Sequence, residues 1–148
     1  MFRGVAQLSL DSKGRVAVPS RFRDQLIERC GGQVVVTADS DRCLLIYPLP
    51  EWEPIEQKLM SLSSFNPQIR ELQRRVVGYA EDVVMDATGR VLVPPALRQF
   101  AQLGRSVVLV GQGNKFELWN KDNWEQLMDR GGGFGAGGLP PELEGFSL

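Results

Sequence analysis

LDSKGRVAVP, residues 10–19, recurs as MDATGRVLVP, residues 85–94. Six residues of the motif, an Asp, a Gly, an Arg, two Val and a Pro, repeat in register at an offset of 75. The likeness continues beyond the motif, because Gly32, Tyr47 and Trp52 correspond to Gly104, Trp119 and Trp124 at an offset of 72. Self-similarity of this kind indicates an internal duplication. We therefore interpret the chain as two copies of a unit of about 45 residues.

The first copy predicts two strands, a helix and a hairpin, in that order. Alternating apolar residues indicate the first two strands, and residues 11–14 supply the turn between them. Pro19 suits the first turn of a helix, which Gly31 and Gly32 should end. Asp39-Ser40-Asp41 indicates the hairpin turn. The predicted strands are 6–10, 16–18, 34–37 and 43–47.

The second copy predicts the same order of elements. Its strands are expected at 83–85, 90–93, 107–110 and 116–119, and its helix at 95–103. Between the copies, Ile55, Leu59 and Leu62 have helical spacing, with Pro54 in the first turn of that helix. Asn66 is the predicted cap of a second helix in the same spacer. The chain thus divides into a first unit (1–50), a two-helix spacer (51–79), a second unit (80–128) and a Gly-rich, acidic, flexible tail (129–148).

The composition excludes most kinds of enzyme. The 148 residues contain no histidine, so mechanisms that need an imidazole are absent. The two cysteines, Cys30 and Cys43, are not in a C-x-x-C pair, which argues against a zinc site and indicates packed, reduced thiols. The two motif aspartates do not form the D-[ST]-G pattern of an aspartic protease. We expect no enzymatic activity, no metal, no cofactor and no small-molecule substrate.

Charge and hydropathy point to the cytoplasm. No run approaches the ~18 apolar residues that cross a membrane, and the N-terminus does not have the pattern of a secretory signal. The net charge of −1 argues against coating nucleic acid by bulk charge. However, residues 1–24 hold five basic residues against two acidic ones, and residues 125–148 hold four acidic residues against one basic. The sequence therefore predicts a local basic patch and an acidic tail.

The size of the repeated unit predicts how the copies associate. A unit of about 45 residues buries too little surface to offset the entropy of its chain. The two copies should therefore share one core. We expect an α+β fold, mostly β, in which the strands of both copies interlock into one pseudo-twofold β-barrel with flanking helices.

A strand, the pattern D-x-x-G-R-[V/I]-x-[V/I]-P, a helix and a hairpin resemble the swapped-hairpin DNA-binding unit of the AbrB/SpoVT regulators and related antitoxins. Two such units, together with MFRG at 1–4, YPLPEW at 47–52 and NKFELW at 114–119, resemble the MraZ family. The resemblance covers residues 1–128. It implies a nucleoid-associated transcription factor that forms ring-like oligomers. It also implies binding to short direct repeats upstream of the protein's own cell division and cell-wall gene cluster, whose transcription it represses.

The basic residues of the motif are the candidate DNA-binding residues. A guanidinium on a rigid loop can bind guanine O6 and N7 or a phosphate, so Arg15 and Arg90 are the leading candidates. Lys13, Arg21 and Arg23 are better suited to phosphates. The second copy has Thr88, Ala96 and Arg98 in their places, so the two copies should contribute unequally. The predicted DNA-binding residues are Lys13, Arg15, Arg21, Arg23, Arg90 and Arg98.

Four further motif residues are expected to shape the turns. Asp11 and Asp86 can accept hydrogen bonds from nearby backbone N–H groups. Gly14 and Gly89 permit positive φ or close approach of another backbone. An alternative role for each arginine is an ion pair with the aspartate of its own turn, and this pair could coexist with DNA binding by preorganising the loop. A second functional hypothesis is an antitoxin-like protein-interaction module.

Overall fold

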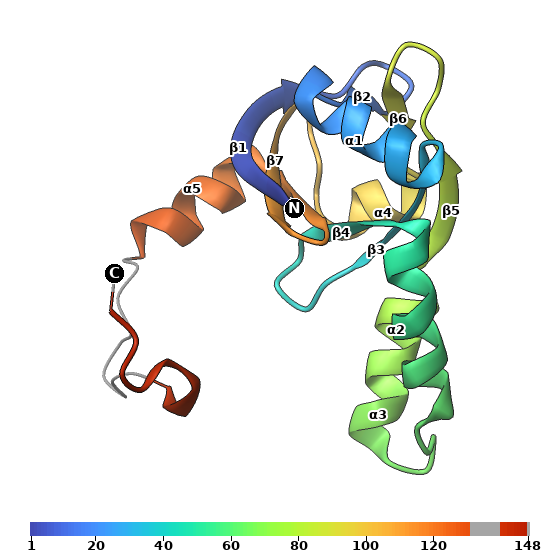
Figure 1. The fold of residues 1–148 in the computed structure, drawn as a ribbon, viewed down its shortest axis with the longest axis vertical. Helices are drawn as coiled ribbons and strands as arrows, with labels where there is room; N and C mark the ends of the chain where they lie inside the picture. The colour runs from blue at the N-terminus through green and yellow to red at the C-terminus, as the bar shows by residue number, and fades with distance from the viewer. Residues whose placement is uncertain (131–139, 148) are drawn as a thin grey trace.

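The computed structural model describes residues 1–130 and 140–147 as an α+β protein with mostly antiparallel strands. Six strands form one sheet in the order β1-β7-β8-β4-β3-β5, and β2 pairs with β6 in a separate ribbon (Figure 1). The Gly-rich segment 131–139, for which flexibility was predicted, lies outside the described residues. The strands are β1 (Phe2–Ser9), β2 (Arg15–Ala17), β3 (Gln33–Ala38), β4 (Leu44–Pro48), β5 (Glu81–Val84), β6 (Arg90–Leu92), β7 (Ser106–Gly113) and β8 (Phe116–Asn120).

Strands of the two copies are interleaved within the sheet. β1 of the first copy pairs with β7 of the second, and β5 of the second copy pairs with β3 of the first. The hairpins meet where β4 pairs with β8. Within the described residues the sheet does not close, since β1 and β5 remain its edges, and the closed barrel predicted from the sequence is not found.

One core serves both copies. Phe2, Phe22 and Phe116 are each about 1% exposed, and the ring centroid of Phe116 lies 4.3 Å from that of Phe2 and 4.9 Å from that of Phe22. Val16 of β2 and Val91 of β6 belong to the same cluster. Burying each large side chain contributes about 1.5–3 kcal/mol. The ribbon and the helices therefore cover the core that a closed barrel would otherwise enclose.

The predicted helices form with shifted boundaries, and a further α-helix, at Lys121–Asp129, was not predicted. In α1, Gly31 ends the helix with φ of 61°, as the sequence predicts. α2 starts before the predicted first turn, so Pro54 lies inside it and cannot donate its hydrogen bond; Pro50 occupies the first turn instead. α4 stops short of Leu103, and Gln102 has φ of 54°. The helical segments are α1 (Ser20–Cys30), α2 (Leu49–Ser61), α3 (Pro67–Leu72), the π-helical η1 (Gln73–Val77), α4 (Pro95–Phe100), α5 (Lys121–Asp129) and the 3-10 helix η2 (Pro141–Leu143).

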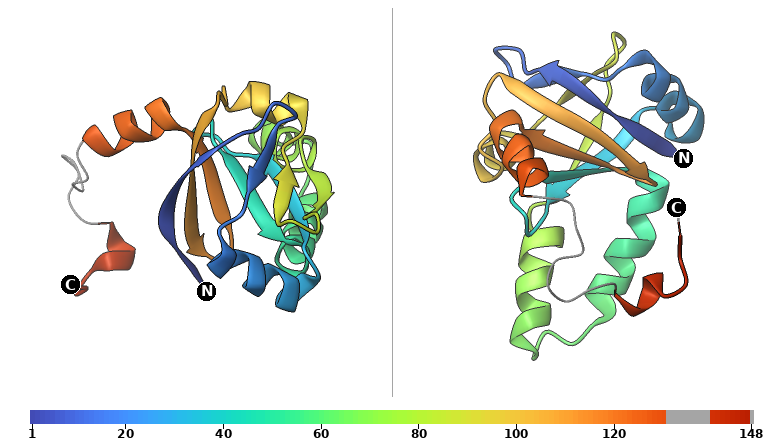
Figure 2. Two further views of the ribbon diagram at one scale, coloured as in Figure 1. Left: turned by 90° about the horizontal axis from the view of Figure 1, so that it is seen from above. Right: turned by 90° about the vertical axis from the view of Figure 1, so that its left-hand side faces the viewer.

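The spacer forms a helical hairpin that projects from the sheet. α2 and α3 run side by side away from the strands (Figures 1 and 2). Asn66 caps α3 by accepting the N–H of Gln68, as predicted, and Gln73 donates to the carbonyl of Leu59 at 2.9 Å. Trp52 is 3% exposed and packs beside the sheet. Across the described part of the chain, the helices are all too short or too polar to traverse a bilayer.

Candidate nucleic-acid interface

The first turn (residues 11–14) and the second turn (residues 86–89) lie at the same end of the molecule, at the top of Figure 1. β2 and β6 pair with Val16 opposite Val91, two positions related by the offset of 75. A local twofold axis therefore passes between these valines. The N–H of Val18 donates to the carbonyl of Gly89 at 2.9 Å, and the N–H of Val93 donates to that of Gly14 at 2.9 Å. The two turns are thus tied together in a symmetric pair.

Each turn is organised by its aspartate. Oδ1 of Asp11 accepts the N–H groups of Lys13 at 2.9 Å and Arg15 at 2.8 Å. In the second turn, Oδ1 of Asp86 accepts those of Thr88 at 3.0 Å and Arg90 at 2.9 Å. The hydroxyl of Thr88 adds a further bond to Asp86 at 2.8 Å. The carboxylates satisfy backbone donors that a tight turn would leave without partners.

The second oxygen of each aspartate binds the motif arginine. Nε of Arg15 donates to Oδ2 of Asp11 at 2.7 Å, and Nε of Arg90 donates to Oδ2 of Asp86 at 2.9 Å. These are the ion pairs considered above as the alternative role of the arginines. Within the described residues, the Nη groups of both arginines have no hydrogen-bond partner. Each guanidinium is therefore oriented through one edge, and its other edge remains available to a ligand.

The carboxylates of both turns are held in their charged form. Hydrogen bonding from the N–H of Arg90 is the main cause that lowers the pKa of Asp86 from 3.8 to about 2. The N–H of Arg15 likewise lowers the pKa of Asp11. A carboxyl group with a lowered pKa stabilises the fold above the pKa of the unfolded chain, and this contribution is lost as the pH falls through the folded value.

Asp86→Asn is therefore expected to lower the melting temperature at neutral pH and to change it little near pH 2. The wild type should lose its advantage between about pH 4 and about pH 2, as Asp86 becomes protonated. Melting temperatures of both proteins, measured by circular dichroism in steps across this range, give the difference directly. A difference that is the same at every pH would show that the charge of Asp86 does not stabilise the turn.

The other predicted DNA-binding residues occupy different surroundings. Lys13 is exposed on the first turn. Arg21 is exposed and lies over the ring of Phe22, 4.7 Å from its centroid, close to Gly4. Gly4 is seven residues from Asp11, roughly 20 Å along the strand. Arg21 is therefore separated from the turns.

Arg23 and Arg98 are half-buried, and each lies against the turn of the other copy. Arg23 also donates through Nη2 to the carbonyl of Val18 at 3.0 Å. The structure thus gathers Lys13, Arg15, Arg23, Arg90 and Arg98 around the paired turns, with Arg21 to one side.

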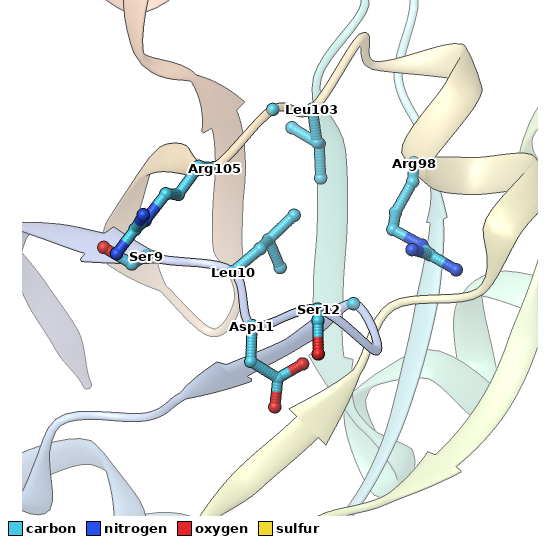
Figure 3. A pocket seen from close by; sticks show the side chains of 9 residues that line it. Ser9, Leu10, Asp11, Ser12, Arg98, Leu103 and Arg105 are labelled. Carbon is cyan, nitrogen blue, oxygen red and sulfur yellow. The ribbon is translucent and has the colours of Figure 1, made fainter.

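A further arginine lies beside the first turn. Arg105 lines a hollow of about 630 Å³ together with Arg98, Ser9 and Ser12. Figure 3 shows the two arginines on opposite sides of Leu10 and Leu103. Sequence reasoning missed Arg105 because the repeat places Gln33 at the matching position of the first copy. The cationic surface is therefore larger beside the first turn than the motif indicates.

Fold and site together define a class: a duplicated α+β protein in which two interlocked units present a twofold pair of arginine-bearing turns. The family model described as "MraZ protein, putative antitoxin-like" matches residues 1–75 and 77–131. The chain belongs to the MraZ family.

Curated relatives match over their whole length. Proteins named transcriptional regulator MraZ are 60% identical in Nitrosomonas europaea and 62% identical in Nitrosospira multiformis, each over 148 residues and all of both chains. The relative of the same name from Pseudomonas aeruginosa is 50% identical over 151 residues, again covering both chains completely.

Proposed function

We propose that this protein is a DNA-binding transcriptional regulator that recognises sequence through Arg15 and Arg90. The observation that carries the proposal is the paired turns, in which an aspartate orients each arginine through Nε and no described residue binds its Nη groups. A guanidinium presented in this way suits bidentate binding of guanine O6 and N7 in the major groove. The names of the relatives support the same function.

The remaining cations suit the phosphate backbone. Lys13 extends from the first turn, Arg105 lies beside it, and Arg21 is exposed away from the turns; these cations would neutralise phosphates without selecting bases. The second turn has Thr88 in place of Lys13, so the first turn should contribute more of the affinity. Asp11, Gly14, Asp86 and Gly89 shape the turns.

One chain offers few phosphate contacts, so useful affinity requires several chains on adjacent DNA repeats. We propose a ring-like homo-oligomer that binds short direct repeats upstream of its own cell division and cell-wall gene cluster and represses it. Its place of action would be the nucleoid, in the cytoplasm. In this arrangement residues 1–50 and 80–128 act as the two DNA-binding units, and 51–79 and 129–148 connect or extend them.

A mobility shift with DNA upstream of the protein's own gene tests this function. We expect a preference for that DNA over scrambled DNA at equal salt, and the shortest fragment that keeps the preference defines the operator used below. Equal binding to both DNAs at every salt concentration would contradict sequence recognition.

Sedimentation velocity at micromolar concentration should show an assembly larger than the 16.5 kDa chain. Trp52, Ile55 and Val76 of the spacer pack beside the sheet, but Met60, Leu62 and Phe65 near the tip of the hairpin are 55%, 40% and 94% exposed. The edge-strand residues Val5 and Val84 are also exposed. Association would remove this apolar surface from water. A monomer would exclude the ring and the avidity argument.

A second candidate function is an antitoxin-like protein-interaction module, which the description of the family model favours. In that case the helical hairpin or the acidic tail would hold a protein partner. A partner that copurifies with the chain, combined with no salt-sensitive DNA binding, would support this function over the first.

A further inference from the structure

The glycine of each turn is covered by an arginine that belongs to the other copy. A Cβ atom built on Gly14 would lie 2.5 Å from Cζ of Arg98, and one built on Gly89 would lie 2.5 Å from Cζ of Arg23. Both glycines are buried, with φ of 85° and 83°. Only a residue without a side chain lets a guanidinium lie this close to the turn. Figure 3 shows Arg98 extending from α4 toward the first turn.

The contact of Arg98 with Gly14 and that of Arg23 with Gly89 are related by the twofold symmetry of the repeat. Arg23 in α1 and Arg98 in α4 are related by the offset of 75, as are Gly14 and Gly89. Each arginine thus crosses from its own copy to the opposite turn. The same segments are joined by backbone hydrogen bonds, from Val18 to Gly89 and from Val93 to Gly14.

The surroundings of these arginines differ from those of a typical phosphate contact. Nε of Arg23 and Nε of Arg98 are buried, and neither has a hydrogen-bond partner in the part of the chain that the structure describes. Arg23 uses Nη2 to bind the carbonyl of Val18. The guanidinium groups of Arg23 and Arg98 thus pack against the protein, whereas those of Arg15 and Arg90 have no partner for their Nη groups among the described residues.

We propose that Arg98 is a positioning residue for Arg15, and that Arg23 is a positioning residue for Arg90. Each packs against a turn glycine, holds the backbone of that turn, and thereby fixes the aspartate that orients the DNA-binding arginine. The inference rests on the proposed function, because it assigns a role toward the same turns. The sequence predicted phosphate contacts for Arg23 and Arg98. In this proposal, each of them instead supports the turn of the other copy.

Hydrogen exchange measures the crossed contact without DNA. Arg98→Ala should speed exchange of the Gly14 and Arg15 amides and leave those of Gly89 and Arg90 unchanged, and Arg23→Ala should do the reverse. The melting temperature of each variant shows whether the fold as a whole has loosened. Faster exchange in both turns of a variant, or in neither, would overturn the crossed contact.

A double-mutant cycle tests the consequence for DNA. Arg98→Ala should lower the ratio of operator affinity to scrambled-DNA affinity by about fivefold, and this loss should vanish when Arg15→Ala is already present. The matched control is the Arg90→Ala background, in which the full loss from Arg98→Ala should remain. Equal losses in both backgrounds would overturn the proposal.

Arg98→Lys separates positioning from a phosphate contact. Lysine keeps the charge but lacks the planar guanidinium, so it should resemble Arg98→Ala in operator preference. If lysine restores the preference while alanine lowers affinity for all DNA alike, Arg98 contacts phosphate and the proposal is wrong. If Arg98→Ala does not fold, Arg98→Lys replaces it in the double-mutant cycle. If neither Arg15→Ala nor Arg90→Ala changes operator preference, the proposed function is wrong. Hydrogen exchange still tests whether Arg98 and Arg23 pack against the turns of the opposite copies.

Discussion

Arg15→Ala is expected to weaken operator binding by about 5-fold to 150-fold, with much less effect on scrambled DNA. A bidentate arginine to guanine contact contributes about 1–3 kcal/mol of discrimination, which corresponds to this range. Arg90→Ala should reduce operator preference in the same way. The ion pairs with Asp11 and Asp86 lie at the surface, where such pairs contribute little to stability, so the melting temperature should change little.

Arg21→Ala is the matched control for this prediction. Arg21 is exposed and separated from the turns, so its loss should weaken binding to all DNA alike and reduce the salt slope by about one. Affinities for operator and scrambled DNA across a salt series distinguish the two behaviours. If Arg15→Ala lowers both affinities equally, Arg15 binds phosphate and another residue recognises the bases. If it mainly lowers the melting temperature, its ion pair with Asp11 is its principal role.

Gly89→Ala should be the most damaging single-methyl change in the turns. Positive φ costs an alanine about 1–2 kcal/mol, and the added Cβ would also displace the guanidinium of Arg23 from the position it holds. We expect a loss of about 2–3 kcal/mol, or roughly 5–10 °C in melting temperature, together with weaker operator binding.

Gly113→Ala provides the control for Gly89→Ala. Gly113 has φ of 79°, and no atom of the described residues lies within 4 Å of a Cβ built there. It therefore reports the conformational cost alone, about 1–2 kcal/mol. Thermal melts of both variants measure the difference between them. Equal losses would show that Arg23 does not pack against the second turn as the structure indicates.

The local features of the turns could be predicted from the sequence because they depend on neighbouring residues. An Asp four residues before an Arg, with a Gly between them, was enough to predict the hydrogen-bonded turn, and Gly31 was enough to end α1. The repeat also predicted that both copies would share a core, because neither is large enough alone. The twofold relation of the turns follows from the same repeat.

Features that depend on packing between distant segments could not be predicted. The edges of the sheet depend on which strands of the two copies meet, and the β-barrel predicted from the sequence is not confirmed. Motif position alone made Arg23 and Arg98 look like surface cations, but α1 and α4 direct them onto the opposite turns. Arg105 lies outside the motif and has no arginine counterpart in the first copy.

The most direct test of base recognition is substitution of 7-deazaguanine for each operator guanine in turn. This change removes the N7 acceptor that a bidentate arginine needs and leaves the phosphates intact. We expect the wild type to lose affinity at particular guanines, and Arg15→Ala or Arg90→Ala to become insensitive at the guanine that each residue contacts. If no guanine is sensitive, or if both variants keep the full pattern of the wild type, Arg15 and Arg90 do not recognise guanine and the central claim is wrong.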